Sequence, residues 1–524
     1  MTLVTGKRKR DDRPLTSTKT RKIAAHSMVN GHANASSNLS TEQREHNAPA
    51  SAAPSLLSNG RLHVQIVTGS YERVLHGFSA SIPPSLLQKA PITNEENLDE
   101  PTPEDDSRIA FSDTFLFAAH ASSIRCLALS PPTEADKRFL ATGSSDERIN
   151  VYSVSTAPPS TSSGGPLPSL TSTSITENRR NRSLGSLIHH DRAITCLDFP
   201  AKGKLFSAAE DNTIAISRTR DWTVLSSIKA PMPKAQGRPS GDTAGPGETP
   251  AGVNDFAIHP SQKLMLSVGR GERCMRLWNL MTGKKAGVLN FDRAVLSQVG
   301  EGKYSSGEGR RVRWHPTGDS YVVGFERGAV VYGIDSQPKA IIRPLPTTKF
   351  HQMRFLPSEY GSGSMNPLAI STEDGRVLFF DTAASESETA ATKLPSCTCL
   401  AQVGGTTAGV TGRVKDFELI HLPSTVEGTE PCLLLVTAGS DGVVRLWTLA
   451  ASEIVAFGEA ARSGTAADTK QIGRLIGTLE TGNRVTCLGA FVMDGKVSEE
   501  NGLDGDGADP RGDDDEEGES DESE

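Results

Sequence analysis

The stretch Leu140-Ala-Thr-Gly-Ser-Ser-Asp146, followed by Ile149-Asn-Val-Tyr152, decides the fold. Apolar residues alternate on both sides of a small, polar turn, which is typical of two antiparallel strands with a tight connection. The segment Ile124-Arg-Cys-Leu-Ala-Leu129 precedes it and alternates in the same way. These segments predict a meander of short strands, and such a unit has to be sought elsewhere in the chain because repeats determine architecture.

Both parts of the unit recur in order. Copies of the first strand occupy residues 194–199, 253–258, 312–314, 350–355, 414–417 and 485–488. Copies of the strand–turn–strand part occupy residues 205–216, 266–278, 321–332, 369–380 and 435–447. A Ser or Thr, a turn Asp and an aromatic residue at these spacings form the WD-repeat signature, with about four strands per blade of a β-propeller.

The last copy, from Val485 to Phe491, lacks its second part, and the missing part stands near the start of the chain. Residues 64–78 have the strand–turn–strand pattern, and Thr114-Phe-Leu-Phe117 supplies a further strand before His120. We therefore predict an all-β, seven-bladed WD40 β-propeller whose last blade combines N- and C-terminal strands. Such closure removes free sheet edges.

Composition divides the chain into three parts. Residues 62–493 form the predicted propeller, with long Pro-, Gly- and Ser-rich insertions expected as surface loops at 83–107, 155–183, 231–251, 383–411 and 458–470. Residues 1–61 and 494–524 have too few apolar residues to offset the entropy of ordering, so both tails are predicted to be disordered. The first tail is basic and the second is acidic.

The net charge of −8 conceals this segregation. The N-terminal basic residues resemble a nuclear-import signal, against the alternative of a solvated basic tail. They are Lys7, Arg8, Lys9, Arg10, Lys19, Arg21 and Lys22. The acidic run Asp513-Asp-Asp-Glu-Glu517 would repel nucleic acid and attract basic proteins, or would serve solubility alone.

Other classes of protein find little support in the sequence. No apolar run is long enough to span a membrane, and no apolar segment of a secretory signal follows the basic N-terminus. Seven cysteines in so long a chain indicate a reducing compartment and not a disulfide framework. Cys397 and Cys399 lack the second ligand pair of a zinc site, so we expect neither a metal nor another cofactor.

Two sets of polar residues resemble a catalytic triad but repeat in neighbouring units. His120, Thr142 and Asp146, completed by Tyr152, have the spacing of the hydrogen-bonded tetrad that fixes the turn of a WD repeat. His190, Ser207 and Asp211 repeat it, with Ser217 at the position of the aromatic residue. Because a catalytic set would not recur in adjacent blades, we predict a structural role and no enzymatic activity.

A second pattern appears when the blades are aligned. A basic residue stands just before the first strand of blades four to seven, at Arg311, Lys349, Arg413 and Arg484, with Arg310 beside the first. First strands of a propeller surround the central channel, so these residues predict a basic, partner-binding rim. Its ligand would be an acidic protein segment or rRNA phosphates; alternatively, these residues cap separate loops.

These residues also resemble a particular family. Ile66-Val-Thr-Gly-Ser-Tyr-Glu-Arg-Val-Leu-His-Gly-Phe78 is similar to the opening of the PAK-interacting, maintenance-of-killer group of WD-repeat proteins. The segments His190–Leu197, His259–Gly269, Leu277–Leu280, Arg413–Asp416 and Arg484–Leu488 continue the resemblance. It covers the predicted propeller in order, although the acidic C-terminus replaces the lysine-rich tail that is frequent in the family.

The resemblance implies a nucleolar scaffold for large (60S) ribosomal subunit assembly and rRNA processing. Expected partners are proteins of the pre-60S particle, with rRNA contacted indirectly, and no membrane or small-molecule substrate. The family also implies an alternative, a signalling adaptor that binds and inhibits a p21-activated kinase. A third function, a receptor of a cullin ubiquitin ligase, is disfavoured because Trp278-Asn-Leu280 and Trp447-Thr-Leu449 lack the Trp-Asp-x-Arg sequence of such receptors.

Overall fold

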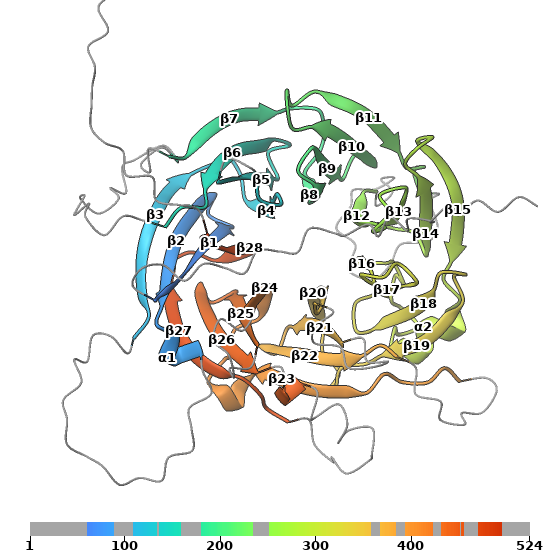
Figure 1. The fold of residues 1–524 in the computed structure, drawn as a ribbon. Coiled ribbons are helices and arrows are strands. Elements are labelled where there is room, and N and C mark those ends of the chain that lie inside the picture. The colour runs from blue at the N-terminus through green and yellow to red at the C-terminus, as the bar shows by residue number, and fades with distance from the viewer. Residues whose placement is uncertain are drawn as a thin grey trace, which may run out of the picture. The chain divides into compact units, whose positions relative to one another are not determined.

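The computed structural model describes residues 60–87, 108–133, 136–158, 175, 180–233, 251–357, 367–383, 393–422, 431–450, 452–454 and 470–494. All of them lie in one unit, Ala53–Glu524. They form seven four-stranded antiparallel sheets arranged as blades around a centre (Figure 1). The predicted seven-bladed β-propeller is confirmed.

Blades one to six each use four consecutive strands, numbered from the centre outward. Blade one contains β4 (Ile124–Leu129), β5 (Lys137–Ser144), β6 (Ile149–Ser155) and β7 (Arg182–Leu187). Blade two contains β8 (Ile194–Ala201), β9 (Lys204–Ala209), β10 (Thr213–Arg218) and β11 (Val224–Lys229). Blade three contains β12 (Val253–Ile258), β13 (Leu264–Gly269), β14 (Cys274–Asn279) and β15 (Lys284–Asn290).

The second half of the ring follows the same plan. Blade four contains β16 (Arg311–Trp314), β17 (Ser320–Gly324), β18 (Ala329–Gly333) and β19 (Pro338–Ile342). Blade five contains β20 (Phe350–Phe355), β21 (Pro367–Thr372), β22 (Arg376–Asp381) and β23 (Cys399–Gly404). Blade six contains β24 (Val414–Leu422), β25 (Cys432–Gly439), β26 (Val443–Ala450) and β27 (Arg474–Glu480).

Blade seven joins the two ends of the propeller. Its inner strand is β28 (Val485–Val492), and its outer strands are β1 (Leu62–Ser70), β2 (Val74–Ile82) and β3 (Ala110–Ala118). β1 pairs with β28 from Val64 opposite Val492 to Ser70 opposite Val485. The segment 114–117, predicted as a further strand, lies in β3. The sequence-based closure is therefore confirmed in its strand assignment.

One prediction for the insertions is wrong. Residues 383–411 were expected as a surface loop, but their described part includes β23 and the 3-10 helix η3 (Thr406–Ala408). β23 is the outer strand of blade five, where Leu400, Ala401 and Val403 are buried. Two short helices, α1 (Pro84–Leu87) and α2 (Arg293–Val299), also occur in connections. Within the described residues, no helix has the length and apolar character needed to cross a membrane.

The apolar core is divided among the junctions between blades. Seven buried clusters are found, and each contains residues of two adjacent blades. Phe379 of blade five, for example, shares a cluster with Trp447 of blade six, and Phe78 of blade seven shares one with Leu434 of blade six. Each blade therefore buries both faces only when both neighbours are present.

Polar side chains join the inner strands around the channel. At every junction a side chain of one inner strand bonds to the next blade or to the segment that leads into it, with heavy-atom distances of 2.6 to 3.0 Å. The pairs are Arg125 with Glu210, Thr195 with the Val253 carbonyl, Asn254 with the Gly309 carbonyl, Arg311 with the His351 carbonyl, Arg354 with the Phe417 carbonyl, Asp416 with the Leu488 amide, and Thr486 with the Ile124 carbonyl.

Asp416 offers a test of the closing junction. Its buried carboxylate accepts hydrogen bonds from the amides of Leu488 on β28 (3.0 Å) and Phe417 (2.9 Å). Asp416→Ala leaves these donors without an acceptor, and we expect it to lower the free energy of unfolding by about 1–3 kcal/mol. Urea denaturation of the full chain measures this loss. Asp221→Ala, which removes an exposed carboxylate paired with Arg218, is the matched control and should leave the free energy of unfolding nearly unchanged, because exposed ion pairs contribute little. An equal loss in both variants would contradict the role assigned to Asp416.

Candidate functional site

The first tetrad surrounds His120 in blade one. The Nδ1 atom of His120 lies 3.1 Å from Oδ2 of Asp146, and its Nε2 atom lies 2.9 Å from Oγ1 of Thr142. Burial lowers the pKa of His120, and the Asp146 carboxylate opposes this only in part. Burial also raises the pKa of Tyr152 to about 12, against opposing hydrogen bonds with Asn150 and Thr142. The His120 imidazole therefore links Thr142 on β5 to Asp146 in the turn between β5 and β6.

Blade two has the same arrangement with one replacement. His190 lies 3.1 Å from Asp211 and 2.8 Å from Ser207, while the Oγ atom of Ser217 is buried without a hydrogen-bond partner. The sequence reasoning missed His189, whose Nε2 atom lies 3.0 Å from the Ser207 hydroxyl. Burial lowers the pKa of His189 to about 4, so its ring is neutral at physiological pH.

In two further blades the aromatic partner is a tryptophan. Trp278 donates from Nε1 to the Ser267 hydroxyl (2.7 Å), and Trp447 donates to the Thr437 hydroxyl (3.3 Å). A hydrogen bond from an aromatic side chain of the third strand to a hydroxyl of the second strand thus occurs in both blade three and blade six. This recurrence favours the structural role predicted for both tetrads. In the part of the chain that the structure describes, no group of three or more His, Cys, Asp or Glu residues is placed to hold a metal ion.

The inner strands all begin on one face of the ring. This follows because every blade starts at the centre and its neighbouring strands are antiparallel. The connections into each inner strand and the turns between second and third strands share this face, which we call the mouth face. The predicted rim residues all lie there, beside the starts of β16, β20, β24 and β28, which border one part of the centre in Figure 1. They are Arg310, Arg311, Lys349, Arg413 and Arg484.

Acidic turn residues compensate part of this charge. Glu326 pairs with both Arg310 (3.3 Å) and Lys349 (2.6 Å), and Glu373 pairs with Arg413 (3.1 Å). The three basic side chains are 41 to 49% exposed, so each pair contributes little to stability and can exchange for a ligand. Three of the five predicted rim residues thus contact acidic residues of nearby turns, as the alternative of separate loop caps expects.

The other two predicted residues contact neutral groups. Arg311 donates from Nε to the His351 carbonyl (2.8 Å), and the Arg484 guanidinium lies 5.9 Å from the centre of the Tyr71 ring. Among the described residues, neither guanidinium has a carboxylate oxygen within 4 Å. Both cations therefore face the mouth without a direct counter-charge.

Two residues that the sequence reasoning missed complete the site. Lys415 follows Val414 on β24, and His351 follows Phe350 on β20. Burial lowers the pKa of Lys415, and so do Arg413 and Arg484; burial lowers the pKa of His351 to about 3, followed by the charges of Lys415, Arg311 and Arg413. These effects place the residues within mutual electrostatic range. The Nε2 atom of His351 is buried without a hydrogen-bond partner.

We call this group the basic mouth. Among the described residues, its cations outnumber the three carboxylates that contact it, Glu72, Glu326 and Glu373. It consists of Arg310, Arg311, Lys349, Arg413, Lys415 and Arg484, together with His351. The aligned position before the inner strands of blades four to seven was a signal in the sequence, whereas His351 and Lys415 stand two residues after Lys349 and Arg413.

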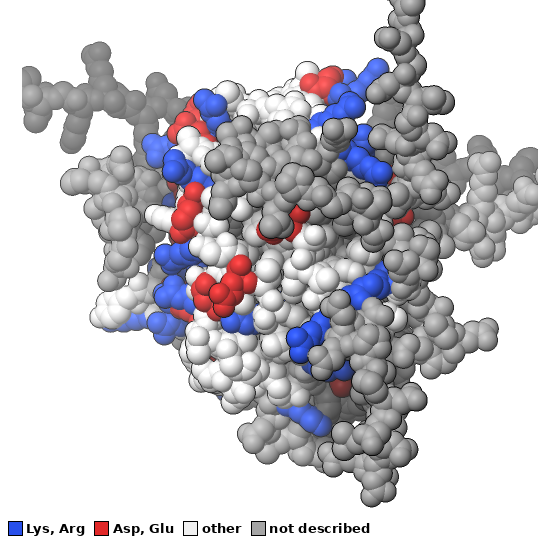
Figure 2. Space-filling view, turned by 90° about the vertical axis from the view of Figure 1, so that its left-hand side faces the viewer, with Lys and Arg blue, Asp and Glu red and all other residues white. Residues whose placement is uncertain are grey.

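The channel below the mouth is charge-balanced. Asp255 pairs with Arg313 (2.7 Å), and Arg354 pairs with Glu418 (3.1 Å). Burial raises the pKa of Glu418, against the opposing charge of Arg354. The excess positive charge is thus a property of the mouth and not of the whole channel. On the side of the ring over β3, charges of both signs are interspersed among uncharged residues over the described surface (Figure 2).

Comparison with known proteins adds to this geometry. The family model described as "WD domain, G-beta repeat" matches residues 111–153 and 181–216. A p21-activated protein kinase-interacting protein 1-like protein of Danio rerio is 26% identical over 438 residues, which cover 83% of each chain. Protein MAK11 of Saccharomyces cerevisiae is 27% identical over 422 residues, covering 75% of this chain and 79% of its own.

The chain is a WD-repeat propeller related to the PAK-interacting and MAK11 proteins. The human p21-activated protein kinase-interacting protein 1 is 25% identical over 432 residues, which cover 82% of this chain. The matches extend across most of the chain, as the resemblance in sequence predicted. Propellers of the WD-repeat family are typically non-catalytic scaffolds, and the comparisons indicate no enzyme family.

Some predictions for this WD-repeat protein lie outside the described residues. These are the basic cluster from Lys7 to Lys22 and the acidic run Asp513 to Glu517. The third residue of the inner strands β4, β8 and β28 is a cysteine; Cys196 and Cys487 are buried, whereas Cys126 is partly buried. Burial raises the pKa of Cys126 to about 12, so its thiolate is scarce at physiological pH.

The low pKa of His351 predicts a pH dependence of stability. In the unfolded chain its imidazole takes up a proton below about pH 6.5, whereas in the folded chain it stays neutral to about pH 3. Between these two pH values the unfolded state binds more protons than the folded state. The contribution of His351 to the free energy of unfolding is therefore complete above about pH 6.5 and is lost as the pH falls from there toward 3. Urea denaturation at about pH 7 and pH 5 should therefore show a smaller loss for His351→Gln than for the wild type. His259→Gln, outside the mouth, controls for removal of an imidazole; an unchanged loss in His351→Gln would contradict the prediction.

Proposed function

We propose that this protein is a non-catalytic scaffold of the nucleus and nucleolus that acts in large (60S) ribosomal subunit biogenesis and rRNA processing. The observation that carries the proposal is the basic mouth, a set of cations held on a rigid ring with fewer carboxylates in contact. Such a surface attracts acidic protein segments or nucleic acid phosphates through long-range electrostatics. The relationship to MAK11 and the basic N-terminal cluster agree with this role.

The mouth favours a protein partner, with rRNA contacted indirectly. Its cations surround a channel end, where a narrow segment that projects from a partner fits better than a duplex. Exposed pairs such as Arg413 with Glu373 can exchange for carboxylates of a partner at little cost because they are weak. We therefore propose that an acidic segment of a pre-60S protein docks at the mouth.

The alternative function is a signalling adaptor that binds and inhibits a p21-activated kinase. Several similar proteins, including those of Danio rerio and Homo sapiens, are named as p21-activated protein kinase-interacting proteins. The same mouth would then bind an acidic segment of the kinase. The two functions differ in the identity of the partner and not in the chemistry of the docking surface.

Affinity purification of the tagged full chain distinguishes them. We expect the wild type to recover large-subunit precursors. Charge reversal of Arg311, Arg413 and Arg484 to Glu should lower the yield of these precursors about tenfold or more, because loss of one charge-assisted contact costs about 1.5–3 kcal/mol. The matched control reverses Lys204, Lys284 and Lys285, which are exposed on the opposite face. It should leave the yield unchanged.

Other outcomes have equally definite meanings. Recovery of kinase complexes without ribosomal proteins would replace the assembly role by the adaptor role. Undiminished recovery of precursors by the charge-reversed mouth, with the same salt dependence as the wild type, would exclude the mouth as the docking site. Thermal denaturation of each variant establishes that the ring is intact.

The nuclear location has its own test. We expect a fluorescent fusion of the full chain to accumulate in the nucleolus, and substitution of Lys7, Arg8, Lys9 and Arg10 by Ala to shift it to the cytoplasm, because import receptors bind such basic clusters. Substituting Lys204, Lys284 and Lys285 by Ala is the control for charge removal. Nucleolar accumulation of the N-terminal variant would disprove the import signal.

A further inference from the structure

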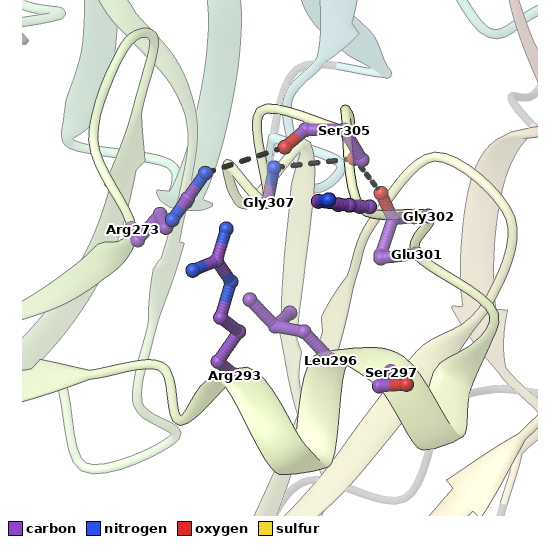
Figure 3. Close-up of a pocket in the computed structure, with 9 residues that line it drawn as sticks. Arg273, Arg293, Leu296, Ser297, Glu301, Gly302, Ser305 and Gly307 are labelled. Carbon is purple, nitrogen blue, oxygen red and sulfur yellow. Dashed lines mark hydrogen bonds between the residues drawn. The ribbon is translucent and has the colours of Figure 1, made fainter. Parts of the chain in front are cut away.

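A second recess lies on the mouth face, between blades three and four. It has a volume of about 250 Å³ and is lined by Arg273, Arg293, Leu296, Glu301, Lys303 and Ser305, among others (Figure 3). Arg273 comes from the turn between β13 and β14, and the remaining residues come from the connection between β15 and β16 that contains α2. We call it the outer pocket.

The fold of the connection builds the walls of the outer pocket. Asp292 caps the start of α2 by accepting from the Ala294 amide, and Leu296 and Val299 anchor the helix in the core. The segment after α2 returns close to Arg273 at Gly307, whose φ is +64°. A Cβ atom there would lie 2.9 Å from Cδ1 of Leu296 and 3.2 Å from Nε of Arg273, so a side chain would crowd the recess.

Glu301 lines the outer pocket and Glu308 and Glu272 lie near it in the sequence, and all three carboxylates already accept hydrogen bonds. The buried Glu301 accepts from the Glu326 amide (2.9 Å), the Arg327 amide (3.1 Å) and the Ser305 hydroxyl. Glu308 accepts from the Gly271 amide (2.8 Å), and Glu272 pairs with Arg276. In the described ranges, no carboxylate oxygen lies within 4 Å of the charged groups of Arg273, Arg293 or Lys303.

The two guanidinium groups differ in how they are held. Arg273 donates from Nε to the Ser306 carbonyl (2.7 Å) and from a terminal nitrogen to the Ser305 carbonyl (3.4 Å). Its side chain is thereby fixed at the pocket while other N–H groups remain available. The Arg293 side chain extends from the start of α2 toward Arg273, as Figure 3 shows. Two arginines from separate elements thus converge on one space.

We propose that the outer pocket binds the phosphate group of a phosphoserine or phosphothreonine side chain on a partner protein. A phosphate monoester carries a charge of about −1.5 to −2 at pH 7 and three acceptor oxygens, which match the convergent arginines and Lys303. Guanidinium groups bind such oxygens through paired N–H donors. A phosphate monoester stands at the end of the side chain that carries it and can enter a recess, whereas the phosphodiester of an RNA chain is flanked on both sides by sugars.

The outer pocket is connected to the basic mouth. Glu301 binds the backbone of the turn that carries Glu326, and Glu326 pairs with Arg310 and Lys349 of the mouth. A partner docked on the mouth face therefore has both sites within one continuous surface. Binding of a phosphorylated residue goes beyond the proposed assembly role, since it adds a modification-dependent contact whichever partner the mouth accepts.

Peptide arrays test the proposal without assuming a flanking sequence. The full chain is applied to peptides with one fixed phosphoserine between randomised positions, and to matched sets with serine or glutamate. We expect retention on the phosphoserine set alone, and at least about a tenfold loss in the Arg273→Gln/Arg293→Gln variant, because each charge-assisted contact contributes about 1.5–3 kcal/mol. The control is Lys284→Gln/Lys285→Gln, which removes the same charge on the opposite face.

Several results would overturn the proposal. One is equal retention on the serine or glutamate set, and another is undiminished retention by the double arginine variant. If single-stranded oligouridylate binds through the two arginines and phosphoserine peptides do not, the outer pocket is an RNA contact. Lys303→Gln gives a second, weaker variant should the double variant fail to fold. The charge-reversed mouth should retain phosphoserine binding, which separates this test from that of the assembly role.

Discussion

The pairing of β1 with β28 is the constraint on which the rest of the structure depends. Seven sheets pack face to face around a centre, and each core cluster belongs to two blades. If this pairing were lost, β1 and β28 would be free edges, and the apolar faces of blades six and one that pack on blade seven would lose their cover. Strands from the N- and C-terminal parts of the propeller therefore have to pair before blades six, seven and one are fully buried.

Closure also explains how the ring holds a docking surface in a fixed geometry. Side chains such as Asp416 and Thr486 fix the inner strand of blade seven to blades six and one. The positions at which inner strands begin are thereby set by the ring and not by the loops before them. Arg413 and Arg484 start neighbouring inner strands, so their spacing is determined by the same bonds. A docking site at this rim is preorganised, which lowers the entropy lost on binding.

Much of the fold was accessible from the sequence because its determinants are local and repeated. The alternation in Ile124–Leu129 and the turn at Asp146 reflect the strand period and the tetrad, and both recur in the other blades. β23 was missed because its outer-strand sequence, Cys399-Leu-Ala-Gln-Val-Gly404, lacks the turn signals of the inner strands. Outer strands contact a single neighbouring strand, so they carry less of the repeated pattern.

The candidate site was accessible only in part, for a different reason. The rim position of Arg311, Arg413 and Arg484 follows from the repeat, but the compensating contacts of Glu326 depend on which turn lies beside which strand in space. In blade two, Ser217 stands where other blades have an aromatic residue, and His189 contacts the Ser207 hydroxyl in its place. His189 is distant from position 217 in the sequence, and no spacing rule anticipates this replacement. The outer pocket is less predictable still, since it arises in a connection without a counterpart in the other blades.

The distribution of charge separates what holds the ring from what is available to a partner. In the channel, Arg313 and Arg354 lie against Asp255 and Glu418, where loss of one partner would leave a buried charge unpaired. At the mouth, Lys415 and Arg484 have cations as neighbours; burial lowers the pKa of Lys415, and the charges of Arg413 and Arg484 lower it further. This repulsion is a cost in the free protein. An anionic partner removes it on binding, so part of the binding free energy is already present as unfavourable electrostatics in the unbound ring.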